Sequence, residues 1–186
     1  PLPAFAQKSA VPDATGFGFP AAQSQQPIAP IGEVAAAVAH LNQLQDSDGS
    51  VRQEPLLLNF DGHAVPSMSL AVAAHSLNLG PQDLRLLPGQ GLMLGRQRID
   101  TDELARVLPQ FYPDRDGRPA FPADSFYDVV SGKIPAAKYA GKLVIVGATA
   151  AGVGTVFNTP VAAAMSPAMI LAHISSSILQ GHFIAQ

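Results

Sequence analysis

A short apolar run followed by a loop of small residues is the feature that most constrains this chain. The run from Leu143 to Val146 reads Leu-Val-Ile-Val without polar alternation, and Gly147 follows it. Four consecutive apolar residues, three of them β-branched, cannot alternate between core and water. They therefore predict an interior strand of a sheet that is covered on both faces, with its carboxyl end pointing into the loop.

The loop from Gly147 to Met165 carries no ionisable side chain. General acid–base and nucleophilic catalysis both need a group that takes or holds a proton, so this loop is better equipped to bind than to react. Ligands of open α/β sheets gather outside the carboxyl ends of the strands. We therefore predict a ligand site without catalytic residues, formed by Thr149, Asn158 and Thr159 with Arg52 and His173 as neighbours.

Two sets of residues, far apart in the sequence, carry a resemblance to a known family. The first set runs through the strand, the loop and the following helix: Lys142, Gly147, Ala148, Thr149, Gly152, Gly154, Thr159, Pro160 and His173. The second set lies upstream: Asp46, Asp48, Gly49, Val51, Arg52 and Pro55. In this order they resemble the signature of the second CHASE family, the sensory extracellular domains associated with bacterial cyclases and histidine kinases. The chain departs from the pattern at Thr155, where the family usually has aspartate, and at Ala168 and Met169, which replace Gly-Val.

The resemblance implies a ligand-sensing domain of a bacterial transmembrane receptor, on the periplasmic or extracellular face of the inner membrane. Such a domain would bind a small molecule and signal to a cytoplasmic cyclase, cyclic-dinucleotide enzyme or kinase. It would be tethered to the membrane through segments outside this chain. The resemblance covers Ile31 to Phe183, and the family's domain normally begins with another α/β portion. We therefore expect the segment before Ile31 either to pair as an edge strand or to be separated from a missing partner by cleavage or truncation, which would leave an exposed apolar patch behind.

Length and composition favour one hydrophobic core and exclude several classes of function. The chain has 186 residues, of which 47% are hydrophobic and 13% are charged, which suffices for one core. Its formal net charge is −3 and its lysines and arginines are scattered, so we expect no nucleic-acid partner. It has no cysteine, which excludes disulfides, thiolate zinc sites and cysteine nucleophiles. No uninterrupted apolar run is long enough to span a bilayer.

The expected fold is α/β, with a mixed β-sheet and flanking helices in a single domain over residues 31–186. Residues 1–30 hold six of the 17 prolines and show no sustained period, which predicts an irregular arm rich in proline, glutamine and alanine. Phe5, Phe17 and Phe19 are the side chains that can attach this arm to the core.

Local signals predict two helices and three turns. Ser67 is a candidate N-cap of a helix that runs to about Asn78. Ser166 and Pro167 open a second helix, which Gly181 ends. Aspartate followed by glycine predicts turns at Asp48-Gly49, at Asp61-Gly62 and at Asp114 to Gly117.

Several motifs have a more ordinary explanation. The spacing of Gly147, Gly152 and Gly154 does not fit a dinucleotide fingerprint, so we expect no cofactor. The Asp46-Asp48-Gly49 segment has glycine at position four of a calcium loop and Leu57 at position twelve, which favours a hairpin turn. The histidines lack the spacing of a helical metal site, so no metal is expected. They are His40, His63, His75, His173 and His182.

The residues leave some alternatives open. Arg52 either pairs with Asp48 across the turn or points at an anionic ligand. His173 is either a hydrogen-bonded structural residue or a ligand contact. The chain as a whole could instead be a hydrolase or transferase with a triad from distant Ser, His and Asp residues, or a dimerisation module without a ligand. A hydroxyl within hydrogen-bond reach of a histidine, beside an open pocket, would support the enzyme. A homodimer is compatible with both the ligand-sensing domain and the dimerisation module.

Overall fold

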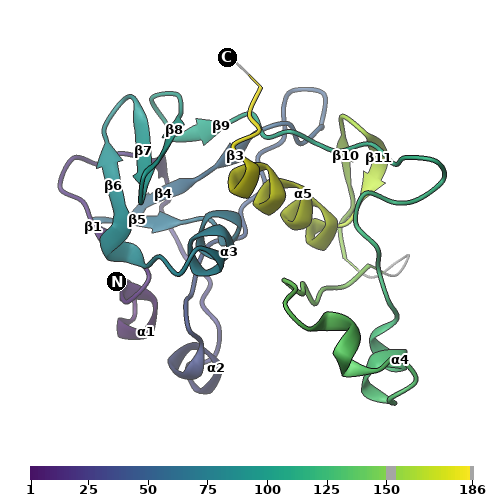
Figure 1. Cartoon of the computed structure of the whole chain (residues 1–186). Coiled ribbons are helices and arrows are strands. Elements are labelled where there is room, and N and C mark those ends of the chain that lie inside the picture. Colours follow the sequence, from purple (N-terminus) through teal and green to yellow (C-terminus); the bar gives the residue numbers. More distant parts are fainter. Residues whose placement is uncertain (150–153, 185–186) are drawn as a thin grey trace.

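The computed structural model describes residues 1–149 and 154–184 (Figure 1). Its central sheet has four strands in the order β1 (Val11–Pro12), β5 (His63–Pro66), β4 (Leu57–Phe60) and β2 (Phe19–Pro20). Strand β2 runs parallel to β4, whereas the other pairs are antiparallel. The sheet is therefore mixed, as predicted.

The turn between β4 and β5 follows directly from its sequence. Asp61 and Gly62 both have positive φ angles, 54° and 72°. A two-residue hairpin favours this left-handed geometry because its twist matches that of the flanking strands. The Asp-Gly pair thus sets the register in which Leu57 faces Pro66.

The remaining strands form three smaller sheets. Strands β6 (Leu84–Leu87), β7 (Gly91–Leu94) and β8 (Gln97–Asp100) make an antiparallel meander. Strand β3 (Glu54–Pro55) pairs with β9 (Arg106–Val107), and β10 (Phe157–Thr159) pairs with β11 (Ala162–Met165). The helices are α1 (Ala4–Gln7), α2 (Ala29–Val34), α3 (Met68–Ser76), α4 (Phe126–Val130) and α5 (Pro167–Gln180), with 3₁₀ turns η1 (Pro81–Asp83) and η2 (Ala136–Tyr139). This mixed content confirms the α/β fold class.

Helices α3 and α5 pack against each other at the centre of the molecule. The N-cap predictions for both are confirmed: Ser67 Oγ accepts from the Leu70 amide at 3.2 Å and Ser166 Oγ from the Met169 amide at 3.4 Å. Helix α5 ends at Gly181, whose φ of 66° is the left-handed conformation that glycine favours. Three fully buried isoleucines line one side of α5: Ile170, Ile174 and Ile178.

The first 30 residues contribute to the sheet instead of lying outside it. Strands β1 and β2 form its two edges, so the prediction that this segment pairs as an edge strand is confirmed. Phe17 is buried in the main core, and Leu2, Ala6 and Ala10 form a small second cluster. The Leu2 amide also donates to the Asp61 carboxylate at 2.7 Å.

The prediction for Leu143 to Val146 is wrong. No strand is assigned to this run, and Leu143, Val144 and Val146 are 55%, 55% and 74% exposed. Within the described residues, no hydrogen bond joins the backbone of 143–149 to another segment. The apolar pattern is typical of a covered strand, but it does not specify which strand the run would pair with. Strands β1 and β2 already occupy both edges of the central sheet.

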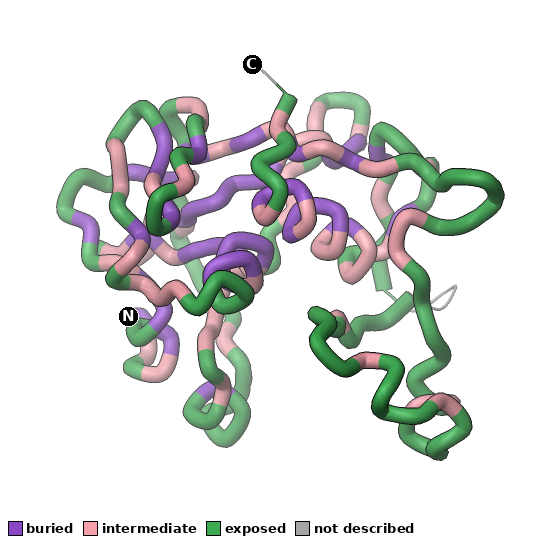
Figure 2. Tube along the Cα trace, in the orientation of Figure 1, coloured by how far each residue is buried: buried purple, intermediate pink, exposed green. Residues whose placement is uncertain are grey.

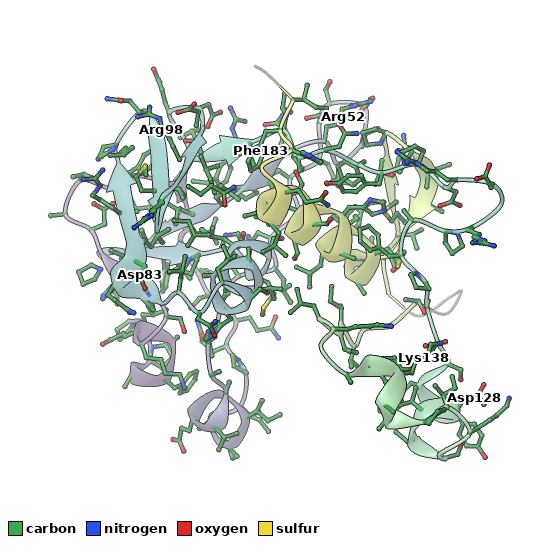
Figure 3. All side chains as sticks on the ribbon, viewed as in Figure 1. Arg52, Asp83, Arg98, Asp128, Lys138 and Phe183 are labelled. Carbon is green, nitrogen blue, oxygen red and sulfur yellow. The ribbon has the colours of Figure 1, made fainter. Side chains whose placement is uncertain are left out.

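The run belongs to a projecting arm, here residues 122–146, that carries α4 and lies away from the core (Figures 1 and 2). Two ion pairs hold the arm together: Lys138 Nζ lies 2.7 Å from an Asp124 oxygen and Lys133 Nζ lies 3.1 Å from an Asp128 oxygen (Figure 3). Phe126, Tyr127 and Val130 are also more than half exposed there. These side chains form an exposed apolar patch on the projecting arm, which adjoins α4 and not the segment before Ile31, where such a patch was expected.

We expect the exposed run to promote self-association, because apolar side chains that meet across an interface are removed from water. Burying one valine side chain is worth about 1.5–3 kcal/mol, so Val144→Lys should weaken dimerisation at least about tenfold. Sedimentation equilibrium measures the dimer dissociation constant. The matched control is Val34→Lys, at a valine that is 83% exposed on α2. Equal association of both variants and the parent would contradict the prediction.

Candidate functional site

The upstream motif folds into a tight turn that the sequence predicts. The Gly49 amide donates to the Asp46 carbonyl at 2.9 Å, and the Ser50 amide donates to Asp48 Oδ1 at 3.0 Å. Gly49 has a φ of 79°, which a residue with a side chain rarely adopts. The Asp48-Gly49 turn is therefore confirmed.

Arg52 spans this turn and binds two carboxylates. Its Nη1 and Nη2 atoms donate to the two oxygens of Asp48 at 2.9 and 2.7 Å, and Nη1 also donates to Asp46 at 2.8 Å. The hydrogen bonds from Arg52 hold the pKa of the Asp48 carboxyl well below its ordinary value, and those from Asp48 and Asp46 raise the pKa of Arg52. The predicted pair across the turn is confirmed. An anionic ligand at Arg52 would have to compete with both carboxylates.

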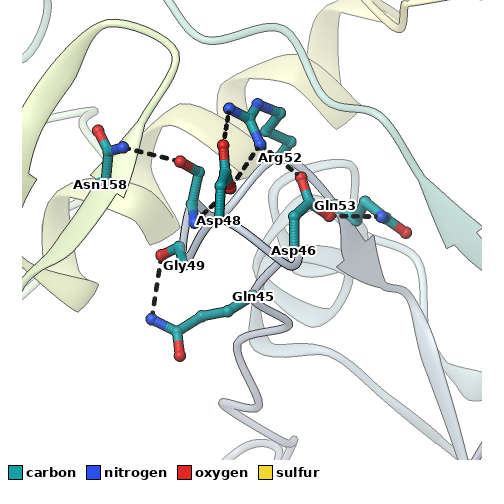
Figure 4. Close-up of polar contacts among 8 residues, drawn as sticks. Gln45, Asp46, Asp48, Gly49, Arg52, Gln53 and Asn158 are labelled. Carbon is teal, nitrogen blue, oxygen red and sulfur yellow. Dashed lines mark hydrogen bonds and ion pairs between the residues drawn. The ribbon is translucent and has the colours of Figure 1, made fainter.

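The turn docks on β10, which comes from the downstream motif (Figure 4). The Val51 amide donates to the Asn158 carbonyl at 2.8 Å, and Asn158 Nδ2 donates to Ser50 Oγ at 2.8 Å. Ser50 and Asn158 also form an isolated parallel bridge. The fold thus brings together Arg52 and Asn158, two of the predicted site residues from opposite parts of the chain.

Thr159 and His173 make contacts within the protein itself. Thr159 is buried, and its hydroxyl donates to the Ala162 carbonyl at 3.0 Å and accepts from the Ala162 amide at 3.1 Å. His173 is also buried, and its Nδ1 accepts from the Tyr112 amide at 3.1 Å. Burial lowers the pKa of His173, so this imidazole is neutral near pH 7. These contacts match the structural alternative weighed for His173.

An aromatic group surrounds the His173 ring. The ring centroids of Phe111, Tyr112 and Phe121 lie 5.4, 6.0 and 4.8 Å from it. Thr149, in contrast, is exposed, and the Gly152 of the downstream motif lies outside the described residues. In the part of the chain that is described, no hydrogen bond or ion pair links Thr149 or His173 with the Arg52 turn.

A buried carboxyl that sequence reasoning missed lies on β3. Glu54 is 3% exposed, and the Ser69 hydroxyl donates to its Oε1 at 2.9 Å. Its Oε2 has no hydrogen-bond partner among the described residues. Burial raises the pKa of Glu54 to about 7, although the Ser69 and Ser67 hydroxyls oppose the shift. The available sequence signal was an acidic residue close to the apolar run Leu56 to Leu58.

His40 is a half-buried titratable group near the same helix start. It bridges to Ser67, the N-cap of α3, and its Nε2 is buried. Burial lowers the pKa of His40 to about 4, with the Pro55 carbonyl opposing the shift. Burial thus disfavours the charged form of both groups beside α3, the carboxylate of Glu54 and the imidazolium of His40.

The hydrolase alternative required a hydroxyl bonded to a histidine. Among the described side chains, no serine or threonine hydroxyl hydrogen-bonds to an imidazole, whereas the Tyr112 hydroxyl lies 3.3 Å from His182 Nδ1. The described residues also contain no group of three metal-ligating side chains. A concave, polar surface above residues 147–159 would distinguish a ligand site from a dimerisation module, and residues 150–153 of that loop lie outside the described residues.

Comparison with known proteins places the chain in a family. The family model described as "CHASE2 domain" matches residues 3–186. It therefore includes α1, β1 and β2 as well as the two motifs. No curated protein and no solved structure matches the chain significantly. Within the described residues, none of the helices has both the length and the apolar character needed to cross a bilayer. The chain belongs to the CHASE2 family, whose members are the sensory extracellular domains of signalling receptors.

Proposed function

We propose that this chain is the small-molecule sensor of a bacterial transmembrane receptor, on the periplasmic or extracellular side, and that it leaves its ligand chemically unchanged. Segments outside this chain would tether it to the membrane and connect it to a cytoplasmic cyclase, cyclic-dinucleotide enzyme or kinase. Family membership supports the sensory part of this proposal.

The observation that carries the proposal is the set of contacts converging on α5. Gln97 Nε2 donates to the Ile178 carbonyl at 2.8 Å, the Gln110 amide donates to Ser177 Oγ at 3.0 Å, and the Tyr112 amide donates to His173. Because α3 also packs on this helix, a shift in any of these segments alters the contacts of α5. A ligand that binds one arrangement better than another would therefore bias α5.

The first test is mass spectrometry of small molecules retained by the purified chain. We expect one molecule at a fixed stoichiometry, which then changes the output of the full-length receptor. Recovery of a chemically converted product after incubation with that molecule would overturn the binding-without-turnover proposal.

We keep Thr149, Asn158 and Thr159, with Arg52 and His173, as the proposed ligand site. Thr149→Val preserves volume and removes a hydroxyl, so it should weaken the ligand response of the full-length receptor by about 1 kcal/mol, or about fivefold. The thermal midpoint of the isolated chain should stay unchanged because Thr149 is exposed. Thr155→Val, at an exposed threonine beyond residues 150–153, is the matched control. A parental dose response in the Thr149→Val receptor would remove Thr149 from the site.

A ligand-free dimerisation module is the second candidate. The exposed run Leu143 to Val146 favours it, since contiguous exposed apolar side chains mark surfaces of association. The Val144→Lys variant described above tests this function directly.

A further inference from the structure

A small pocket beside α3 lies apart from every residue of the proposed site. It has a volume of about 80 Å³. Its walls come from α3, from the turn at η1 and from the strands β6 and β7. Four leucines line it, Leu70, Leu79, Leu84 and Leu94, and the polar side chains of Lys8, Ser9 and His75 also border it.

Small side chains create the space. Ala71 and Ala74 face the pocket from α3, and Ala36 and Ala37 face it from the chain that follows α2. Ala71 is buried but does not belong to the main hydrophobic cluster, so its methyl group borders the pocket and not the core. Ala36 and His75 are exposed, and the pocket therefore opens to solvent on their side.

Two of the polar side chains at the pocket, those of Lys8 and Ser9, already bind other parts of the protein. Lys8 Nζ donates to the Gly32 and Glu33 carbonyls at 3.4 and 3.3 Å and also to that of Ala35, where α2 ends. Ser9 Oγ accepts from the Val38 amide at 2.8 Å. A charged ligand would have to displace these contacts or lose its hydration without compensation.

We propose that this pocket is a binding site for a small, uncharged, apolar molecule. Its size is about half that of the ~150 Å³ apolar cavity that binds benzene, and its open side adds room. A single aromatic ring or a short branched alkyl group therefore sets the upper limit of ligand size. The walls supply apolar contact, which favours such a molecule over water.

The position of the pocket connects it to the rest of the fold. Its wall helix α3 contacts Glu54 through Ser69 and packs on α5. A molecule in the pocket would stabilise the present position of α3 against both neighbours. Any effect of this stabilisation on signalling rests on the proposed function, whereas the binding of a molecule in the pocket does not.

Titration of the chain with toluene, followed by ¹⁵N NMR, tests the site. We expect saturable shift changes concentrated at residues 36–37, 70–75 and 79–81, with a dissociation constant of about millimolar. Benzoate, a charged molecule of similar shape, should bind at least tenfold more weakly. Changes centred elsewhere, or equal binding of benzoate, would overturn the proposal.

Filling variants give the second arm of the test. Ala37→Leu and Ala71→Leu should each weaken toluene binding at least tenfold, one from the loop and one from α3. The matched control is Ala39→Leu, which makes the same change two residues beyond Ala37 and outside the lining, and it should bind toluene as the parent does. Unchanged affinity in a folded Ala37→Leu or Ala71→Leu variant would show that toluene binds elsewhere. If no ligand alters the full-length receptor although toluene occupies the pocket, the proposed sensory mechanism fails and the binding site stands.

Discussion

Replacing Glu54 by glutamine is expected to stabilise the protein increasingly as pH rises. Burial raises the pKa of Glu54 from 4.5 to about 7, so between these values the unfolded chain releases a proton that the folded protein keeps. The parent therefore loses stability across this window, by roughly 3 kcal/mol at 1.36 kcal/mol per pKa unit. The Glu54→Gln variant cannot ionise at this position, and its stability relative to the parent should grow by that amount from pH ~4 to pH ~8.

His40 acts in the opposite direction over nearly the same window. Burial lowers its pKa from 6.5 to about 4, so the unfolded chain takes up a proton there that the folded protein does not. Stability from His40 is lost as pH falls from 6.5 to 4. In the parent the two contributions offset each other, whereas the Glu54→Gln variant should become more stable as pH rises through this range.

Urea unfolding at several pH values measures both effects. Comparing variant with parent at each pH cancels the other titrating groups, which are common to both proteins. Glu103→Gln makes the same substitution at an exposed carboxyl and serves as the control. A constant difference between the Glu54→Gln variant and the parent from pH ~4 to pH ~8 would mean that Glu54 is not protonated in the folded protein near neutrality.

Truncating the centre of α5 is expected to cost about 2–5 kcal/mol. Ile174 lies on α5 and its side chain is fully buried in the main core. The Ile174→Ala change therefore leaves a cavity that the neighbouring side chains cannot fill. For a chain of this size the thermal midpoint should fall by about 4–20 °C, since each kcal/mol shifts it by about 2–4 °C. Differential scanning calorimetry measures the shift.

The control for this truncation is Ile184→Ala. Ile184 lies just beyond α5 and is 51% exposed, so its truncation should change stability by no more than about 0.5 kcal/mol. A similar loss in both variants would show that α5 is not the rigid centre of the domain. It would also weaken the proposal that α5 collects signals from several segments.

Features that depend on a few neighbouring residues could be predicted from the sequence. Ser166 and Pro167 start α5 because the first amides of a helix have no helical hydrogen-bond partner. The Ser166 hydroxyl accepts from one of these amides, and Pro167 has no amide hydrogen that would need a partner. Asp48 and Arg52 meet because the turn at Gly49 brings them together. The α/β class and the family followed from patterns of the same local kind.

Features that depend on distant partners were decided by the tertiary structure. Leu143 to Val146 have the composition of an interior strand, yet their exposure depends on which segments occupy the sheet edges, and β1 and β2 do so here. The contact of Asn158 with Ser50 spans 108 residues, and the burial of Glu54 arises only when Ser69 on α3 closes over β3. Local sequence determines which conformations a segment favours. Its burial and its hydrogen-bond partners depend on how the whole chain packs, because side chains from several distant segments must come together to exclude water from one residue.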